Sequence, residues 1–328
     1  MKEILDKLIN QYTLGQAEAK AIMLRIANEE FSDAEIAAFI TTYLMRPISV
    51  EELSGFRAAL MELAVKVDFG DIKAIDLCGT GGDGRNTFNI STLTAFIVAA
   101  AGYNVVKHGN YGVSSVSGSS NVLEYLGYQF TNDEAVLKSQ LERQNICFLH
   151  APLFHPAMKA VGPTRRNLRV KTFFNLLGPL VNPATPSHQV VGVYDFHVAR
   201  LYQYFLQQMD RHYFIVHSLD GYDEISLTAD TKVIGEGKET ILRAGEFNLP
   251  TYSAEELYGG DSVAEAAKIF INVLENKATR AQRDVVLANA GLAIQCFSME
   301  KSLEDCVNEA KMALESGKAF EILKAITQ

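Results

Sequence analysis

The first 66 residues carry apolar side chains at helical spacing and little that favours strands. Apolar residues at positions 4, 5, 8 and 9 mark one short helical face, and those at 19, 22, 23 and 26 mark the next. The Ser-x-x-Glu sequences at 32–35 and 49–52 each open a further apolar-periodic run, which is typical of a capped helix start. The pattern predicts a small all-helical domain over residues 1–66. Its apolar faces exceed what four short helices bury among themselves, so we expect part of this surface to form a dimer contact.

From residue 67 the pattern changes, because short β-favouring runs alternate with longer amphipathic ones. The expected strands are 74–78, 104–106, 146–149, 190–194 and 213–216. The expected helices are 91–101, 134–144 and 197–209, followed by 262–274, 283–296 and 303–314. Strands that alternate with helices indicate an α/β domain with a mostly parallel sheet, here over residues 67–328.

Composition and charge narrow the class. The chain has 328 residues, 48% of them apolar, and a formal net charge of -9. That acidic balance argues against non-specific nucleic-acid binding, which needs a basic face. The four cysteines lie far apart without metal-ligand spacing, so we expect buried, unpaired thiols and no zinc site. No apolar run approaches the roughly 18 residues of a membrane helix, and the first residues do not resemble a leader. We expect a cytoplasmic protein that contacts no membrane.

A glycine-rich turn, residues 78–84 (CGTGGDG), follows the first expected strand. It formally satisfies G-x-G-x-x-G, but a dinucleotide fold needs an acid about 20 residues on, where this chain has Lys107 and His108. It also nearly matches a P-loop, but Arg85 and Asn86 stand where Lys and Ser/Thr are needed. The turn still has the two features that both motifs share. Its glycines let backbone N–H groups approach an anion, and the N-terminus of the following helix adds partial positive charge. The alternative to an anion-binding turn is a glycine turn that only reverses the direction of the chain and binds no ligand.

The residues after this turn suit a phosphorylated ligand. No Asp or Glu occurs from Arg85 through Asn121, which predicts a pocket free of anions. The sequence NIST at 89–92 opens an apolar helix with neutral donors, Lys107 adds a point charge, and the serine-rich stretch 114–120 adds small donors. Turns that follow parallel strands meet at one edge of the sheet. We therefore expect the glycine turn and the turns at 107–110 and 218–221 to converge on a polyphosphorylated sugar.

Several segments, in this order, resemble the anthranilate phosphoribosyltransferase family over nearly the whole chain. They are 79–83 (GTGGD), 89–92 (NIST), 107–110 (KHGN), 155–159 (HPAMK), 165–166 (RR), 174–180 (FNLLGPL) and 220–224 (DGYDE). The resemblance implies a nucleoside phosphorylase type II fold, in which a helical domain, with part of 160–182 packed on it, forms a homodimer. It also implies Mg²⁺-dependent transfer of the 5-phosphoribosyl group from phosphoribosyl pyrophosphate (PRPP) to the amine of anthranilate, releasing pyrophosphate, in tryptophan biosynthesis.

The resemblance implies roles for individual residues as well. The expected PRPP contacts are Gly79, Thr80, Gly82, Asp83, Thr87, Asn89, Ser91, Thr92, Lys107, Ser115 and Ser119. The expected anthranilate contacts are Gly79, His108, Asn110, Pro152 and Arg165, with Arg165 as the partner of the carboxylate. The expected magnesium ligands are Ser91, Asp223 and Glu224. No covalent nucleophile stands out, so we expect direct displacement helped by positioning and charge stabilisation.

One departure and two alternatives remain. The family usually has Arg and a small residue after KHGN, whereas this chain has Tyr111 and Gly112. The loss of the arginine is expected to affect substrate affinity, and Gly112 is expected to affect how well ordered this loop is. A pyrimidine nucleoside phosphorylase of the same fold class is one alternative, and the turn at 108–110 with Arg165 favours the transferase over it. A non-catalytic, family-like binding protein is the other. The acidic pair at 223–224 and the negative net charge count against it.

Overall fold

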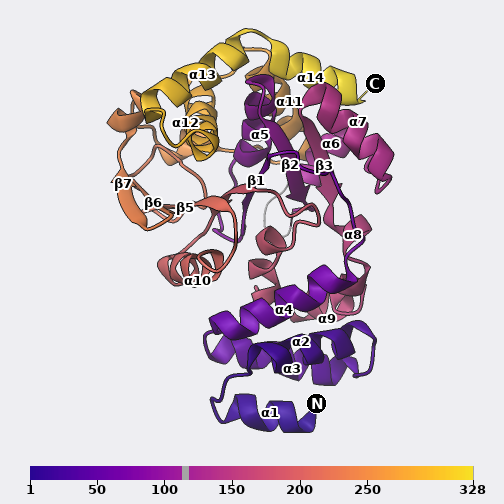
Figure 1. Ribbon diagram of the computed structural model, residues 1–328. Coiled ribbons are helices and arrows are strands. Elements are labelled where there is room, and N and C mark those ends of the chain that lie inside the picture. Colours follow the sequence, from indigo (N-terminus) through magenta and orange to yellow (C-terminus); the bar gives the residue numbers. More distant parts are fainter. Residues whose placement is uncertain (113–117, 328) are drawn as a thin grey trace.

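The computed structural model describes residues 1–112 and 118–327, with an N-terminal helical part beside a larger α/β part (Figure 1). The helical part contains α1 (Lys2–Ile9), α2 (Gln16–Ala27), α3 (Asp33–Met45) and α4 (Val50–Leu63). Both expected capping boxes are confirmed. Ser32 Oγ accepts the N–H of Glu35, Ser49 Oγ accepts the N–H of Glu52, and each glutamate carboxylate accepts the serine N–H in return.

A seven-stranded sheet forms the α/β part, in the order β3-β2-β1-β4-β5-β6-β7. Its strands are β1 (Ala74–Gly79), β2 (Asn104–Gly109), β3 (Ile146–His150), β4 (His188–Gly192), β5 (His212–Ser218), β6 (Thr231–Gly235) and β7 (Lys238–Leu242). Strands β1 to β5 run parallel, as predicted, while β6 and β7 form an antiparallel edge. Neither β6 nor β7 is among the expected strands. Every residue of β7 is exposed or only partly buried, so no apolar run marks it, whereas β6 is mostly buried but short. Strand β4 begins two residues before its expected start, because His188 and Gln189 are polar yet buried.

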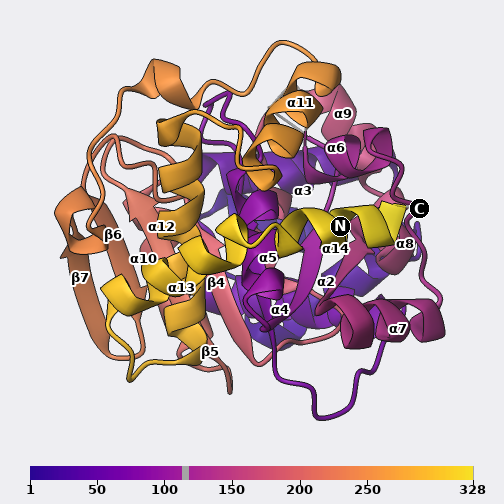
Figure 2. The same cartoon turned by 90° about the horizontal axis from the view of Figure 1, so that it is seen from above.

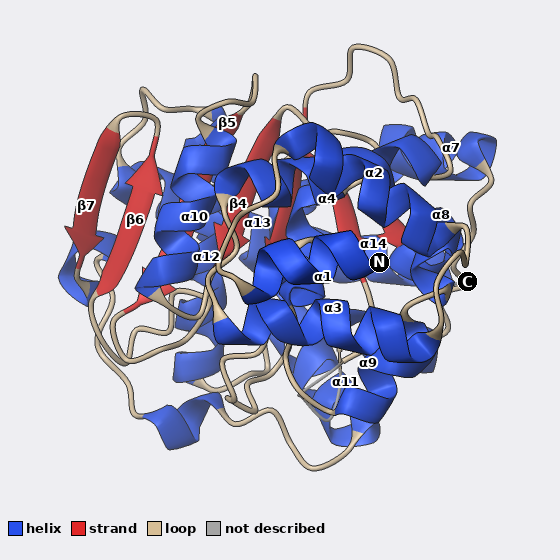
Figure 3. Ribbon diagram, turned by 90° about the horizontal axis from the view of Figure 1, so that it is seen from below, coloured by secondary structure: helices blue, strands red, loops and turns tan. Residues whose placement is uncertain are grey.

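Helices cover both faces of the sheet. The remaining α-helices are α5 (Ile90–Ala100), α6 (Ser119–Tyr125), α7 (Glu134–Gln144), α8 (Ala151–Phe154), α9 (Gly162–Leu168), α10 (Phe196–Leu206), α11 (Val263–Leu274), α12 (Arg280–Phe297), α13 (Leu303–Glu315) and α14 (Lys318–Thr327). Figure 2 shows α5, α12, α13 and α14 over one face, and Figure 3 shows α10 and the N-terminal helices on the other side. Alternate residues of β5 supply both cores, since Phe214 faces the α5 side and Ile215 the α10 side. Every residue of α5 except Ser91 is buried.

The segment 160–182 returns from the α/β part to pack against the helical part. It carries α9 and the short 3₁₀ turns η2 (Phe173–Leu176) and η3 (Gly178–Leu180), and η1 (Pro156–Lys159) precedes it. The ring of Phe173 lies 4.9 Å from the rings of both Tyr43 and Phe56, centroid to centroid. A shared apolar core therefore joins this segment to α3 and α4. The domain boundary at residue 66 stays a prediction.

Among the described residues, no helix is long and apolar enough to cross a membrane. Two further 3₁₀ turns, η4 (Ala244–Phe247) and η5 (Ala254–Leu257), lie between β7 and α11. The four cysteines are unpaired. Cys147, Cys296 and Cys306 are buried, whereas Cys78, at the end of β1, is only half-buried, so the expectation of a buried thiol is wrong there.

Candidate active site

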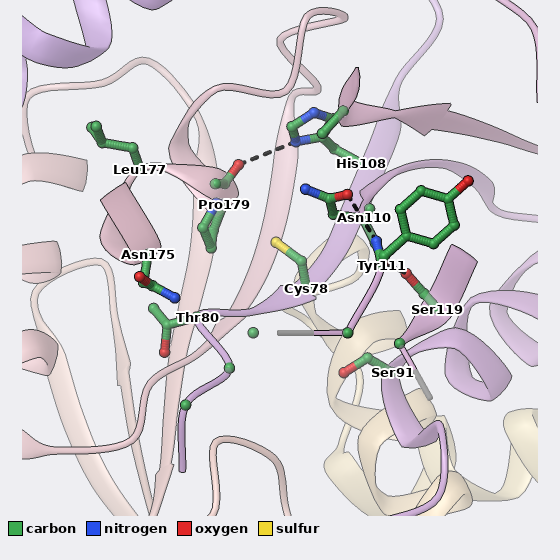
Figure 4. A pocket seen from close by; sticks show the side chains of 18 of the residues that line it. Cys78, Thr80, Ser91, His108, Asn110, Tyr111, Ser119, Asn175, Leu177 and Pro179 are labelled. Atoms are coloured by element: carbon green, nitrogen blue, oxygen red, sulfur yellow. Dashed lines mark hydrogen bonds between the residues drawn. The ribbon is translucent and has the colours of Figure 1, made fainter. Parts of the chain in front are cut away.

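A cavity of about 690 Å³ lies at the carboxyl ends of the parallel strands, between the α/β part and the helical part. Its walls come from the turns after β1, β2 and β3, from α4, and from residues 151–181 (Figure 4). Every expected site residue in the described part of the chain lines this cavity, while Ser115 lies outside the described residues. The structure therefore brings the predicted residues together. The role of each residue stays a prediction.

The glycine turn after β1 is held to the turn after β5. The backbone N–H of Gly81 donates to Oδ2 of Asp223 at 2.8 Å. A Cβ on Gly79 would lie 2.2 Å from that same oxygen, so any side chain there would displace the Asp223 carboxylate. Gly82 has a φ of +80°, a left-handed conformation that side chains rarely adopt. Glycine at position 79 thus makes room for Asp223, in addition to its predicted role in binding an anion.

Three carboxylates line the cavity, so the expectation of a pocket free of anions is wrong. It holds for residues 85–121, but Asp83, Asp223 and Glu224 enter from either side of that stretch. Burial, followed by the charge of Asp83, raises the pKa of Asp223 above its ordinary value. Burial, followed by the charge of Asp223, raises the pKa of Glu224 well above its ordinary value. The ionised pair is therefore unfavourable unless a cation joins it.

The donor set fits a hard divalent cation. Ser91 Oγ donates to Oε1 of Glu224 at 2.9 Å, so hydroxyl and carboxylate oxygens lie together. Within residues 1–112 and 118–327, no group of three or more His, Cys, Asp or Glu side chains is placed to hold a metal ion. Magnesium usually takes one or two protein carboxylates and completes its shell with water and substrate phosphates. Ser91, Asp223 and Glu224 therefore fit an ion that is shared with a phosphorylated ligand.

Buried groups of neighbouring segments hold the turn at residues 107–110 in place. Lys107 is buried, and its ammonium donates to the carbonyl oxygen of Leu77. The backbone N–H of His108 donates to Oδ1 of the fully buried Asp76 at 3.1 Å. The His108 ring bonds through Nδ1 to the carbonyl oxygen of Gly178 at 3.1 Å (Figure 4), so Nδ1 carries the proton. Burial lowers the pKa of His108 to about 3, which keeps the ring neutral.

Asn110 and Tyr111 form the next part of the wall. The N–H of Tyr111 donates to Oδ1 of Asn110 at 2.8 Å, which turns the Asn110 amide nitrogen toward the side of the cavity that holds Pro179 (Figure 4). The Tyr111 hydroxyl donates to Oε1 of Glu124 at 2.7 Å. Oδ1 of Asn121 accepts the N–H groups of Gly112 and Gly118, each at 3.0 Å. Tyr111 and Gly112, which differ from the residues usual in the family, are therefore held to α6 by hydrogen bonds.

Arg165 lines the cavity from α9. It is half-buried, and its guanidinium carbon lies 5.1 Å from the ring centroid of Phe174. Burial lowers the pKa of Arg165. No carboxylate in the described part of the chain forms an ion pair with it. A half-desolvated guanidinium beside a cavity suits a carboxylate ligand in two-point geometry.

Sequence reasoning missed several residues that shape this site. Asp76 and Asn121 carry no motif of their own. Asp76 accepts from His108 on another strand. Asn121 accepts from Gly118, at the start of its own helix, and from Gly112, which precedes that helix. A Cβ on Gly192 would lie 1.5 Å from the backbone oxygen of Asp223, yet position 192 reads only as a strand residue. Lys171 donates to the carbonyl oxygen of Gly82. These four residues do not line the cavity but hold the residues that do, and apart from the contact between Asn121 and Gly118 only the fold brings the partners together.

Comparison with known proteins extends these observations to the whole chain. Family models of the glycosyl transferase family match residues 2–64, as its helical bundle domain, and residues 71–320, as its a/b domain. A Christiangramia forsetii protein named anthranilate phosphoribosyltransferase is 54% identical over 326 residues, which are 99% of this chain and 98% of that protein.

Two solved structures carry the same name. The anthranilate phosphoribosyltransferase of Thermus thermophilus is 32% identical, with a TM-score of 0.92 over 99% of this chain and 98% of that one. The Saccharomyces cerevisiae protein, in complex with PRPP and Mg, is 26% identical, with a TM-score of 0.90 over 98% and 95%. These similarities confirm the expected fold class and the family resemblance.

Proposed function

The chain belongs to the glycosyl transferase family that includes the anthranilate phosphoribosyltransferases, and we infer that it is itself a pentosyltransferase of this kind. It transfers the 5-phosphoribosyl group of PRPP to the amine of anthranilate and releases pyrophosphate, a step of tryptophan biosynthesis. The observation that carries this assignment is the convergence, on one cavity, of an anion-binding glycine turn, an acidic pair and the half-buried guanidinium of Arg165.

We assign PRPP to the β1 side of the cavity. The proposed contacts are Gly79, Thr80, Gly82, Asp83, Thr87, Asn89, Ser91, Thr92, Lys107 and Ser119, all of which line it. Backbone N–H groups of the glycine turn and the N-terminus of α5 supply fixed donors for phosphate oxygens. The ammonium of Lys107 donates to the carbonyl oxygen of Leu77, so in this conformation it attracts phosphate through its charge and not through a direct hydrogen bond.

We assign anthranilate to the opposite side. Arg165 pairs with its carboxylate, and Gly79, His108, Asn110 and Pro152 complete the contacts. The His108 ring donates its Nδ1 proton to Gly178 and is neutral, so it does not protonate the aromatic amine, whose lone pair must stay free for the attack. Because aniline-type nitrogen is uncharged at neutral pH, no strong base is needed to activate it.

Displacement at the anomeric carbon then follows from position and charge. The amine attacks the anomeric carbon as the bond to the pyrophosphate oxygen breaks, through a sugar with cationic character, and the amine proton leaves afterwards. Magnesium, held by Ser91, Asp223 and Glu224, would neutralise the charge that develops on the leaving pyrophosphate. The chain itself orients the two substrates and supplies donors that need no rearrangement during the reaction.

One assay tests this function. The pure protein is incubated with anthranilate, PRPP and Mg²⁺, and the loss of anthranilate fluorescence is followed. No loss at any magnesium concentration would reject the assignment. Release of a free base from pyrimidine nucleosides and phosphate, in place of that signal, would favour a nucleoside phosphorylase. Absence of both activities would favour a binding protein without catalysis.

We also propose a homodimer through the helical part and a cytoplasmic location. Exposed apolar side chains near the ends of α1 and α3, among them Tyr12 and Met45, support the dimer. The four unpaired cysteines, three of them buried, support a reducing compartment.

A further inference from the structure

Lys171 connects the two sides of the cavity. It lies between α9, which carries Arg165, and η2, which packs on the helical part through Phe173. Its ammonium donates to the carbonyl oxygen of Gly82 and sits 5.3 Å from the ring centroid of Tyr194. Its stem runs along the glycine turn, because a Cβ on Gly82 would lie 3.3 Å from both Cδ and Cε of Lys171.

This contact holds a peptide group that follows a glycine, the residue that restricts the backbone least. Gly82, with its φ of +80°, has no side chain to restrict it, and Gly81 and Gly84 on either side also have positive φ. In a planar trans peptide the N–H of Asp83 points opposite to the carbonyl of Gly82. Holding that carbonyl therefore sets the direction of a donor in the anion-binding turn.

We propose that Lys171 is a positioning residue for PRPP, which holds the Gly82–Asp83 peptide so that the glycine turn is ready for the pyrophosphate group. This role rests on the proposed transferase function. Lys171 is not among the residues that line the cavity, so it acts through the glycine turn. Because it belongs to the segment that carries Arg165, it ties the PRPP side to the anthranilate side. Tyr194 keeps the ammonium in place through a cation–π contact.

Lys171→Met tests the proposal, since the exposed side chain is replaced by one of similar length that cannot donate. We expect the KM for PRPP to rise roughly tenfold or more, as when a hydrogen bond from a charged donor is lost, while the KM for anthranilate changes less than about twofold. Lys171→Arg should restore most of the affinity. Lys268→Met, which removes an exposed lysine of α11 remote from the cavity, is the matched control and should leave both values unchanged.

Calorimetry with inorganic pyrophosphate and Mg²⁺ separates this proposal from the proposed function, because it needs no turnover. Weaker binding by Lys171→Met than by the unaltered protein, roughly tenfold, supports the positioning role even if anthranilate is not the acceptor. Equal pyrophosphate binding by the two proteins would overturn it. So would equal rises in both KM values, or an arginine variant as impaired as the methionine variant.

Discussion

The N–H of Gly81 and the Oδ2 atom of Asp223 are 2.8 Å apart and 142 residues apart in sequence, and their hydrogen bond joins the two turns that we assign to PRPP and magnesium. Two glycines make this approach possible, because a Cβ at either Gly79 or Gly192 would overlap Asp223. Asp223 therefore occupies a position prepared by two other strands. A change at any of these residues should act on the whole site.

Asp223→Asn and Glu224→Gln should abolish magnesium-dependent turnover yet raise the stability of the metal-free protein. The raised pKa values of both carboxylates mean that the ionised pair lowers stability at neutral pH, so a neutral amide should recover on the order of 1 kcal/mol. Thermal unfolding with and without a chelator measures the effect. A variant that loses both activity and stability would instead indicate a structural carboxylate.

The same carboxylates predict how magnesium binding depends on pH. Because their pKa values are raised, Asp223 and Glu224 stay protonated at a higher pH than ordinary carboxylates do. A proton must leave these carboxylates before the cation binds. The apparent affinity for Mg²⁺ should therefore fall as the pH is lowered from about 8 to about 6. Titration of turnover with Mg²⁺ at several pH values measures this shift. An affinity independent of pH would contradict the assigned ligands.

Arg165→Ala should raise the KM for anthranilate roughly 10- to 100-fold and change the KM for PRPP far less, since a charge-assisted pair with the carboxylate is lost. Steady-state kinetics with each substrate varied in turn measures the split. Arg166→Ala is the comparison, because Arg166 is the exposed neighbour on the same helix and should have a smaller effect. Equal effects of Arg165→Ala on both substrates would contradict its assignment.

The chemistry at the ends of strands was predictable because it is local. The glycine turn and the acidic pair each follow an expected strand, and the ends of parallel strands meet at one edge. Lys171 was not predictable, since its contact with Gly82 spans 89 residues and depends on the return of segment 160–182. Glu52 reads as a capping residue, yet it is also fully buried and paired with Arg46. A local motif does not reveal a second partner supplied by another element.

Asn121→Ala should weaken PRPP binding more than Tyr111→Phe does. Asn121 accepts two backbone N–H groups, from Gly112 and Gly118, whereas the tyrosine change removes only the hydrogen bond from Tyr111 to Glu124. We expect a KM for PRPP roughly tenfold higher for the first variant and less than about threefold higher for the second. The reverse order would show that the tyrosine hydroxyl, and not the Asn121 amide, anchors this part of the wall.

Tyr111→Arg, which restores the residue usual in the family, should be tolerated. An arginine there can pair with Glu124 in place of the tyrosine hydroxyl, and an exposed ion pair is worth little. The KM for PRPP should stay within about fivefold of the original value. A larger loss would indicate that this chain has adapted its site to an aromatic ring at position 111, which lies 4.8 Å from the ring of His150.

The proposed dimer predicts where the introduction of a single charge will change the oligomeric state. Leu44 and Met45, at the end of α3, are 46% and 78% exposed although apolar, and Figure 3 shows α1 and α3 side by side on one outer face. Met45→Asp should shift the protein toward monomer, because a charge buried in an apolar contact lacks a partner. Met312→Asp is the matched control, since Met312 of α13 is 66% exposed but lies outside the helical part. Light scattering at micromolar concentration measures the mass, and a monomeric unaltered protein would reject the dimer outright.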